Sequence, residues 1–153
     1  MRAPISVVVA TRDAAAVLPF QLAALGEGLA EGLIRDLIVV DGGSTDATLQ
    51  IAAEAGAQVL RGAAVRAQAL AQGVQAAGGE WVLIATRFSV PVPGWTGQVL
   101  RHLERAAGQP GRVLARHCAE RGWRRLWPAE AWPLLPQGAA YVAVAPSVRN
   151  WRR

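Results

Sequence analysis

The residues best suited to chemistry form the run Asp41-Gly42-Gly43-Ser44-Thr45-Asp46, which directly follows the short apolar segment Leu37–Val40. A carboxylate at the tip of a buried strand can accept hydrogen bonds from a base or a ribose, and glycines let a ligand approach the backbone closely. Hydroxyl and acidic residues then begin a helix, whose exposed N–H groups favour anions. The alternative is a plain strand–turn–helix junction in which Asp46 is only a helix cap, and the run by itself leaves both open.

Strands and helices alternate along the part of the chain that must position this run. The predicted strands are Ile5–Ala10, Leu37–Val40, Ala57–Leu60 and Trp81–Ala85, and the predicted helices are Ala14–Ala30, Ala47–Ala55 and Val65–Ala77. Such alternation with short connections predicts right-handed crossovers and a parallel sheet with helices on its faces. Because ligands of these sheets sit at the carboxyl ends of the strands, Thr11-Arg12-Asp13, residues 41–46 and the segment after Ala85 are expected around one crevice.

The pattern is weaker beyond Ser89. We expect a loop at residues 91–94, a helix from Trp95 to about Ala107, and a short strand at Val113–Ala115. A stretch rich in Trp and Pro, for which we assign no strand, follows at Gly122–Pro136; a last strand is expected at 140–145 and a tail at 149–153.

Composition limits the class of protein. Hydrophobic residues make up 52% of the 153 residues and charged ones 18%, which indicates a globular chain. All 16 basic residues are arginine, a sign either of coding bias or of phosphate and acidic-lipid binding. The later part of the chain is the more basic, but it lacks the long basic run of a nucleic-acid arm. Cys118 is the only cysteine, so it forms no intramolecular disulfide and no Cys-based metal site.

The apolar run near the start is too short for a signal peptide or a membrane span. We therefore expect a soluble cytoplasmic protein. Contact with a membrane surface stays open because residues Arg121–Trp132 mix cations with indoles. The alternative is that these Trp side chains close the core over a shortened C-terminal half.

Four segments in order resemble family 2 glycosyltransferases of the GT-A fold, over roughly residues 4–97. They are the strand and turn Ser6–Asp13, the segment Ile38–Asp46 with Gly42 where many members carry a second Asp, the helix Val65–Gly73, and Gly79–Ile84. The Asp-Gly-Gly-Ser variant, together with Pro93-Gly94-Trp95, is similar to a small bacterial subgroup linked to glycolipid- or arsenosugar-type products.

The resemblance implies a Rossmann-like GT-A fold, with a mostly parallel sheet flanked by helices and a shortened C-terminal half. It implies one domain over residues 1–148, divided into a nucleotide-binding part at about 4–97 and a reduced acceptor part at about 98–148. The expected ligand is a nucleotide sugar of the UDP or GDP type.

The resemblance also implies roles for individual residues in that site. Thr11 and Asp41 would lie at the base and ribose, and Arg66 would approach the base or the diphosphate. Ser44 and Asp46 match the family pattern and could instead serve mainly the turn and the helix cap.

The chain departs from the family pattern where a metal ligand is expected. Members carry an Asp-x-Asp-like element after the fourth strand, whose carboxylate holds Mg²⁺ or Mn²⁺ against the diphosphate. Residues Ile84–Val90 contain no acid, and Phe88 stands about where the Asp would be. Arg87 could neutralise the diphosphate without metal, or it is a surface residue. Among the later acids, Glu130 is the one weak candidate for a general base.

Three functions follow as expectations. The first is sugar transfer from a nucleotide sugar to an unknown acceptor, with weak or altered metal dependence. The second is a catalytically degenerate relative that acts as a nucleotide-binding or protein-interaction module. The third is a membrane-surface module built on the segment Arg121–Trp132.

Overall fold

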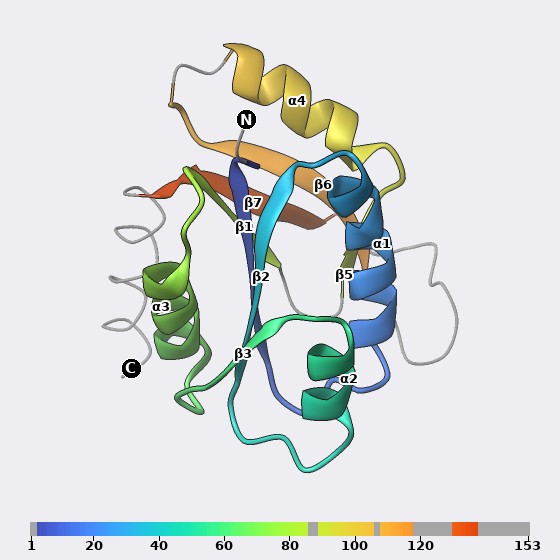
Figure 1. Ribbon diagram of the computed structural model, residues 1–153, viewed down its shortest axis with the longest axis vertical. Coiled ribbons are helices and arrows are strands. Elements are labelled where there is room, and N and C mark those ends of the chain that lie inside the picture. Colours follow the sequence, from blue (N-terminus) through green and yellow to red (C-terminus); the bar gives the residue numbers. More distant parts are fainter. Residues whose placement is uncertain (1–2, 86–88, 106–107, 118–129, 138–153) are drawn as a thin grey trace.

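The computed structural model describes residues 3–85, 89–105, 108–117 and 130–137, in which strands and helices alternate as far as residue 85 (Figure 1). In chain order the elements are β1 (Ile5–Thr11), α1 (Leu18–Ala30), β2 (Ile34–Asp41), α2 (Thr48–Glu54), β3 (Gln58–Arg61), α3 (Arg66–Ala76), β4 (Trp81–Ala85), β5 (Ser89–Pro91), α4 (Trp95–Arg105), β6 (Gly111–His117) and β7 (Glu130–Pro136).

Within the described residues the strands form a seven-stranded sheet in the order β3-β2-β1-β4-β7-β6-β5. The four strands β3, β2, β1 and β4 are mutually parallel, whereas β7, β6 and β5 each run antiparallel to the neighbour before them. The order 3-2-1-4 of the parallel strands is that of a Rossmann-like sheet. The predicted α/β class with helices flanking the sheet is confirmed.

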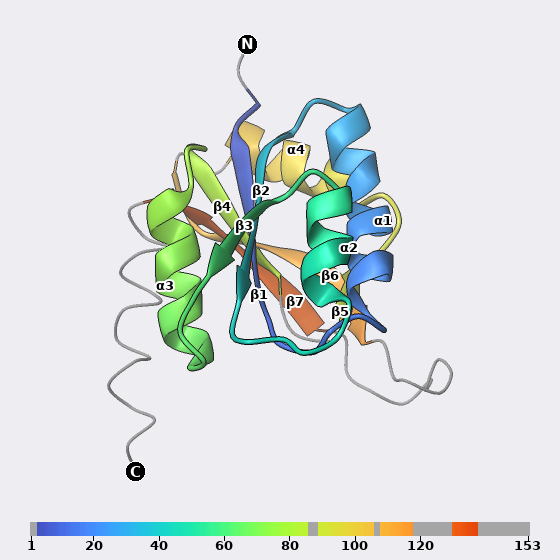
Figure 2. The ribbon, with the colours of Figure 1, turned by 60° about the horizontal axis from the view of Figure 1, so that its bottom comes forward.

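Side chains of β1 are buried on both faces of the sheet. Val7 and Val9 belong to the core under α1, α2 and α4, whereas Val8 belongs to the core under α3. Figure 2 shows α3 on one side of the strands and α1 and α2 on the other. Burial on two faces explains why the sequence of β1 is a continuous apolar run and not an alternating one.

The helix boundaries agree with the glycine signals at their ends. Gly32 and Gly56 have φ of 69° and 75°, a left-handed conformation that follows a helix readily only when no Cβ is present. The start of α1 differs from the predicted Ala14, because residues 14–17 form a turn and the helix begins at Leu18. Pro19 stands in the first turn, where its missing N–H removes no helical hydrogen bond.

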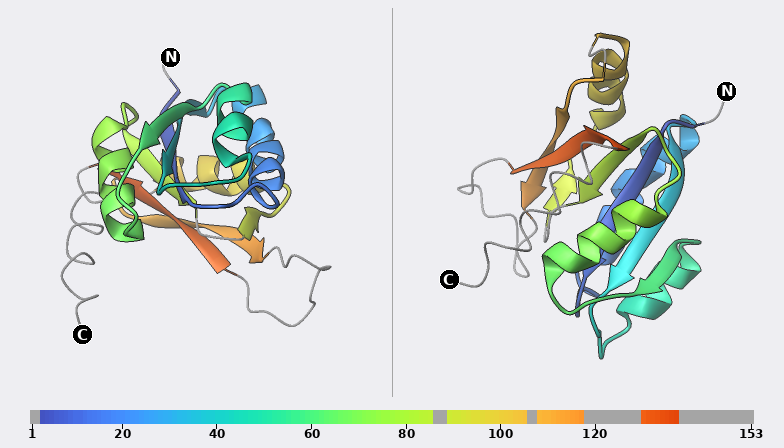
Figure 3. Two further views of the ribbon diagram at one scale, coloured as in Figure 1. Left: turned by 90° about the horizontal axis from the view of Figure 1, so that it is seen from below. Right: turned by 90° about the vertical axis from the view of Figure 1, so that its left-hand side faces the viewer.

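The antiparallel half contains a strand that the sequence pattern did not predict. β7 pairs with β4 through residues 134–136 and with β6 through residues 130–134 (Figure 3). Pro133 therefore lies opposite β6 only, and Pro136 opposite β4 only. A proline cannot donate to a strand ladder, so this partial overlap makes two prolines compatible with a strand inside the sheet. The expected loop at residues 91–94 is likewise shortened, because Pro91 ends β5.

The Trp-rich segment contributes to the core where the structure describes it. Trp132 is fully buried, and its Nε1 donates to Ser89 Oγ at 2.7 Å. Gln21 of α1 donates to the carbonyl of the same serine at 2.8 Å, which ties α1, β5 and β7 together. The indole of Trp132 therefore packs in the core, which agrees with the expectation that Trp side chains of this segment close the core. Residues 121–129, the expected strand at 140–145 and the tail at 149–153 lie outside the described residues.

Among the described helices, none combines the length and the apolar character needed to cross a bilayer.

Candidate functional site

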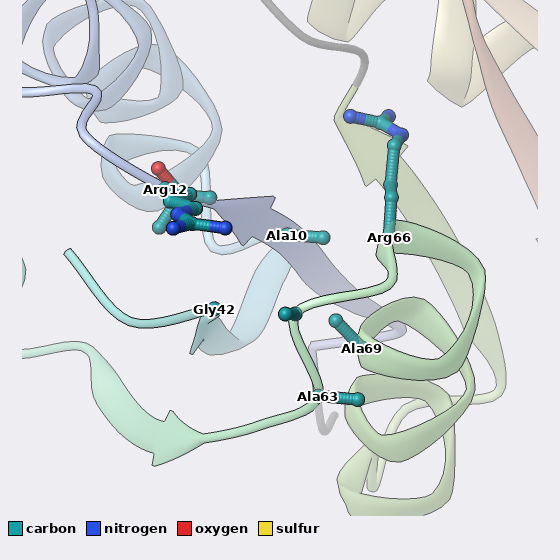
Figure 4. Close-up of a pocket in the computed structure, with 8 residues that line it drawn as sticks. Ala10, Arg12, Gly42, Ala63, Arg66 and Ala69 are labelled. Carbon is teal, nitrogen blue, oxygen red and sulfur yellow. The ribbon is translucent and has the colours of Figure 1, made fainter.

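A pocket of about 280 Å³ opens at the carboxyl ends of the parallel strands (Figure 4). Its walls come from the end of β1, the start of the β2–α2 loop, the β3–α3 loop and the first turn of α3. The lining residues are Ala10, Thr11, Arg12, Gly42, Ala63, Ala64, Arg66 and Ala69. The structure thus brings three predicted site residues, Thr11, Gly42 and Arg66, to one cavity at the expected edge of the sheet.

Backbone hydrogen bonds extend the sheet past the strand ends and so shape this pocket. Gly42 N donates to Thr11 O at 2.8 Å, and Gly62 N donates to Asp41 O at 2.8 Å. A Cβ at Gly62 would lie 2.3 Å from Val40 Cγ1, so only glycine lets the β3–α3 loop pass this close to β2.

The far wall of the pocket is held by a side chain of α3. Gln72 Oε1 accepts the N–H of Ala63 at 3.0 Å and thereby fixes the β3–α3 loop on the helix. The sequence reasoning missed Ala63 and Ala64 as pocket residues because methyl side chains carry no chemical signal. The one usable sign was a glycine directly after β3.

Thr11 carries a buried hydroxyl with no partner among the described residues. Its Oγ1 is inaccessible to solvent and makes no hydrogen bond there, although the residue lines the pocket. A buried hydroxyl left unsatisfied costs about 1–3 kcal/mol. An unsatisfied buried group in a folded protein calls for an explanation, and a ligand or a water in the adjoining pocket is one.

Two arginines border the pocket from opposite sides. Arg66 begins α3, and its Nη2 donates to the carbonyl of Ala85 at 3.3 Å, at the end of β4. Arg12 follows β1 and is exposed. Figure 4 shows Arg12 and Arg66 on the two sides of a floor that contains Ala10 and Ala69. The pocket edge is therefore cationic.

Asp41 uses its carboxylate to shape its own loop. The side chain is only 3% exposed; Oδ2 accepts the N–H groups of Gly43 at 3.0 Å and Ser44 at 2.9 Å, and Oδ1 accepts the Ser44 hydroxyl at 2.5 Å. A carboxylate offers about four acceptor positions, so three are already occupied. Asp41 and Gly43 are absent from the pocket lining, and their predicted contact with a nucleotide stays a prediction.

Ser44 and Asp46 connect the β2–α2 loop to the turn after β1. Ser44 Oγ accepts the N–H of Asp13 at 2.8 Å, and Asp46 Oδ2 accepts the N–H of Ala15 at 3.1 Å. Asp13, at a left-handed φ of 48°, accepts the N–H of Thr45 at 2.8 Å in return. This role of Asp13 was not predicted, because the contact joins residues 32 positions apart.

Asp46 also serves the start of α2. Its Oδ1 accepts the N–H of Thr48 at 2.9 Å and the hydroxyl of the same residue. The hydroxyl of Thr48 is the main cause that lowers the pKa of Asp46 below its ordinary value of 3.8. Asp46 therefore acts as the expected cap of α2, because its carboxylate accepts the N–H of the first helical residue, Thr48. Ala47, which stands at the helix boundary, has no side chain that could do so.

Residues 6–142 match glycosyl transferase family 2, a span that covers most of the chain. The chain belongs to that family. Among solved structures, this family 2 chain is similar to glucosyl-3-phosphoglycerate synthase from Mycobacterium tuberculosis in complex with Mn²⁺, UDP and glucosyl-3-phosphoglycerate, at 26% identity and a TM-score of 0.59. The similarity covers 70% of this chain and 42% of the mycobacterial chain.

A second solved neighbour supports the GT-A fold alone. Residues 1–349 of S. aureus TarS share 19% identity at a TM-score of 0.61, over 70% of this chain and 34% of that one. This family 2 chain therefore spans less than half the length of the solved structures that it resembles. No curated protein matches it.

The acids described near the pocket do not fit the divalent cation that the family implies. Mg²⁺ and Mn²⁺ take oxygen ligands, commonly carboxylates. The carboxylates of Asp13, Asp41 and Asp46 each accept hydrogen bonds from the loops. Over residues 3–85, 89–105, 108–117 and 130–137, no group of three or more acidic, His or Cys side chains could hold a metal ion.

The two predicted catalytic candidates are described only in part. Arg87 lies outside the described residues. Glu130 is the first residue of β7, opposite Ala115 of β6. Because β7 runs antiparallel to β4, Glu130 lies toward the carboxyl end of β4, on the side of the sheet that holds the pocket. Its side chain is outside the described part, so its role as a base stays a prediction.

Proposed function

We propose that this chain binds a UDP- or GDP-type nucleotide sugar in the pocket between β1 and α3 and transfers the sugar to an acceptor, with weak or altered metal dependence. The observation that carries the proposal is the buried, unsatisfied hydroxyl of Thr11 in a pocket bordered by Arg12 and Arg66. A nucleotide supplies both a base or ribose for the hydroxyl and a diphosphate for the arginines.

The solved relatives support the ligand class. The mycobacterial synthase, at 26% identity, has been crystallised with UDP and also with UDP-glucose. In the proposal, Thr11 and Gly42 face the base and ribose, Arg66 faces the diphosphate, and Asp41, Gly43, Ser44 and Asp46 hold the loop that forms one wall.

A second candidate is a nucleotide-binding module without sugar transfer. It is favoured by one observation, the poor fit of the described acids to a metal site. The two candidates differ in turnover: only the first predicts release of the nucleoside diphosphate from a nucleotide sugar when an acceptor is supplied.

The Thr11→Val variant tests the binding proposal, with titration calorimetry against UDP and GDP in Mn²⁺ as the measurement. Valine keeps the shape and removes the hydroxyl, so the fold should be as stable as before or more stable. Loss of one neutral hydrogen bond should weaken nucleotide binding by about 3- to 10-fold. If the natural protein binds neither nucleotide, or Thr11→Val binds as tightly as the natural protein, the pocket is not the nucleotide site.

A further inference from the structure

Among the described residues that line it, the pocket carries two guanidinium groups and no carboxylate. Arg12 and Arg66 are the charged residues of its lining. Asp13, which is next to Arg12 in the sequence, and Asp41, which precedes Gly42, direct their carboxylates to N–H and hydroxyl groups of the β2–α2 loop. An anion that enters the pocket therefore meets the positive charge of both arginines.

The first turn of α3 adds to this charge. Arg66 is its first residue, the boundary residue Val65 gives no side-chain cap, and the first turn contains no acid. Unpaired N–H groups at a helix start attract anions. Together with the two arginines, they give the pocket the donors that a diphosphate needs.

Gly42 leaves open the space in which a family-like carboxylate would stand. A Cβ built there would lie 3.4 Å from Ala63 O and 3.5 Å from Thr11 O, which is ordinary contact between two pocket walls. The backbone of Gly42 is not left-handed, so a Cβ would fit there without backbone strain. Glycine at this position therefore adds no negative charge to the pocket wall, whereas an Asp would add one.

We propose that Arg12 and Arg66 neutralise the diphosphate directly, so that the pocket binds a nucleoside diphosphate without a divalent cation. This proposal rests on the proposed function and specifies how its ligand is held. Guanidinium groups pair with phosphate oxygens through two parallel hydrogen bonds and remain charged at every physiological pH. Two of them, from different elements, replace the charge that a divalent cation would supply.

The test is titration calorimetry of UDP, GDP and uridine with the intact chain, in EDTA and in Mn²⁺. The proposal expects UDP or GDP to bind with the same dissociation constant in both buffers and more weakly as salt is raised. Binding that requires Mn²⁺ would overturn the metal-free mode, together with the weak metal dependence, and leave nucleotide-sugar binding and transfer standing. No binding of either nucleotide in either buffer would overturn both.

Arginine variants locate the charge. Arg12→Gln, on an exposed turn, should weaken UDP binding in EDTA about tenfold or more, as loss of a charged hydrogen bond does, and leave uridine binding unchanged. Arg66→Gln should weaken UDP binding in the same way. If Arg66→Gln fails to fold, Arg12→Gln alone still tests the proposal. Arg61→Gln is the matched control, because Arg61 is exposed at the end of β3 and lies outside the pocket lining. If Arg61→Gln weakens UDP binding as much as Arg12→Gln does, the effect comes from the overall positive charge of the protein. Direct neutralisation of the diphosphate by Arg12 and Arg66 would then be wrong.

Variants at Gly42 test the same proposal by adding a negative charge to the pocket, where the arginine variants remove a positive one. Gly42→Asp should weaken UDP binding in EDTA, whereas Gly42→Asn, of the same size and neutral, should weaken it much less. If the two variants bind UDP in EDTA equally well, negative charge at the pocket does not oppose the ligand, and the arginine clamp is wrong.

Discussion

The backbone N–H of Asp13 donates to Ser44 Oγ at 2.8 Å, and thereby fastens the turn after β1 to the loop after β2. The fastening is reciprocal, because the Asp13 carboxylate accepts the N–H of Thr45 at 2.8 Å. Arg12 and Gly42, which line the pocket, are carried by these two segments. The run from Asp41 to Asp46 thus contributes to the pocket largely by fixing the two segments that line it.

Replacement of Asp41 by alanine tests this structural role. The change leaves the N–H groups of Gly43 and Ser44 and one hydroxyl without their acceptor, so the free energy of unfolding should fall by about 1–3 kcal/mol. Nucleotide binding should weaken at the same time, because the loop loses its shape. Urea denaturation followed by calorimetric titration measures both. A variant with normal stability and weak binding would instead assign the carboxylate to the ligand.

Stability should depend on pH through Asp46. Hydrogen bonding, chiefly from the Thr48 hydroxyl, lowers its pKa in the folded state below the ordinary 3.8. A group with a lowered folded pKa contributes stability that is complete above its unfolded pKa and is lost as pH falls through the folded value. The Asp46 contribution should therefore disappear on acidification below pH 3.8, and urea denaturation at a series of acid pH values measures it.

The Asp46→Asn variant is the control for that pH series. The amide oxygen can still accept from the loop, but it does not titrate. The variant should consequently lose less stability over the same acid interval than the natural protein. If the free energy of unfolding falls equally steeply with pH in both proteins, acids other than Asp46 cause the loss.

Two glycines of α1 should respond in opposite ways to alanine. A Cβ at Gly28 would lie 2.6 Å from the ring of the fully buried Trp95, so Gly28→Ala should destabilise the fold by about 1–3 kcal/mol through overpacking. A Cβ at Gly26 would have no heavy atom within 4 Å. Gly26→Ala should stabilise the helix by about 0.5–1 kcal/mol. Thermal unfolding compares them, and equal effects would show that Trp95 has room to move.

The parallel half of the fold could be predicted from sequence, and the antiparallel half only in part: α4 and the centre of β6 were predicted, whereas β5 and β7 were not. The strands from β1 to β4 are apolar runs separated by amphipathic helices and glycine stops, so local pattern is sufficient. β7 contains Pro133 and Pro136, and only its staggered pairing with β4 and β6 makes it a strand. That pairing depends on long-range register, which no local pattern contains.

The candidate site was predictable to a similar degree. The strand-end rule predicted Thr11 and Gly42 at one crevice, and both line the pocket. Arg66, which also lines it, was expected there only from the family resemblance. It could not show that the Asp41 carboxylate turns back onto Gly43 and Ser44, because that depends on hydrogen bonds within the loop. It also gave no sign that Ala63 and Ala64 form a wall.

The place of β7 in the sheet has a consequence for synthesis on the ribosome. β7 is the last described strand of the chain, yet it lies between β4 and β6. While residues 130–136 are still inside the exit tunnel, no other described strand joins the antiparallel pair of β5 and β6 to β4. The nascent chain can therefore assemble its parallel half early, but the two halves of the sheet become one only when β7 inserts between them. Truncation before residue 130 should leave the two halves of the sheet without that strand and joined through α1, which contacts β5 and Trp95.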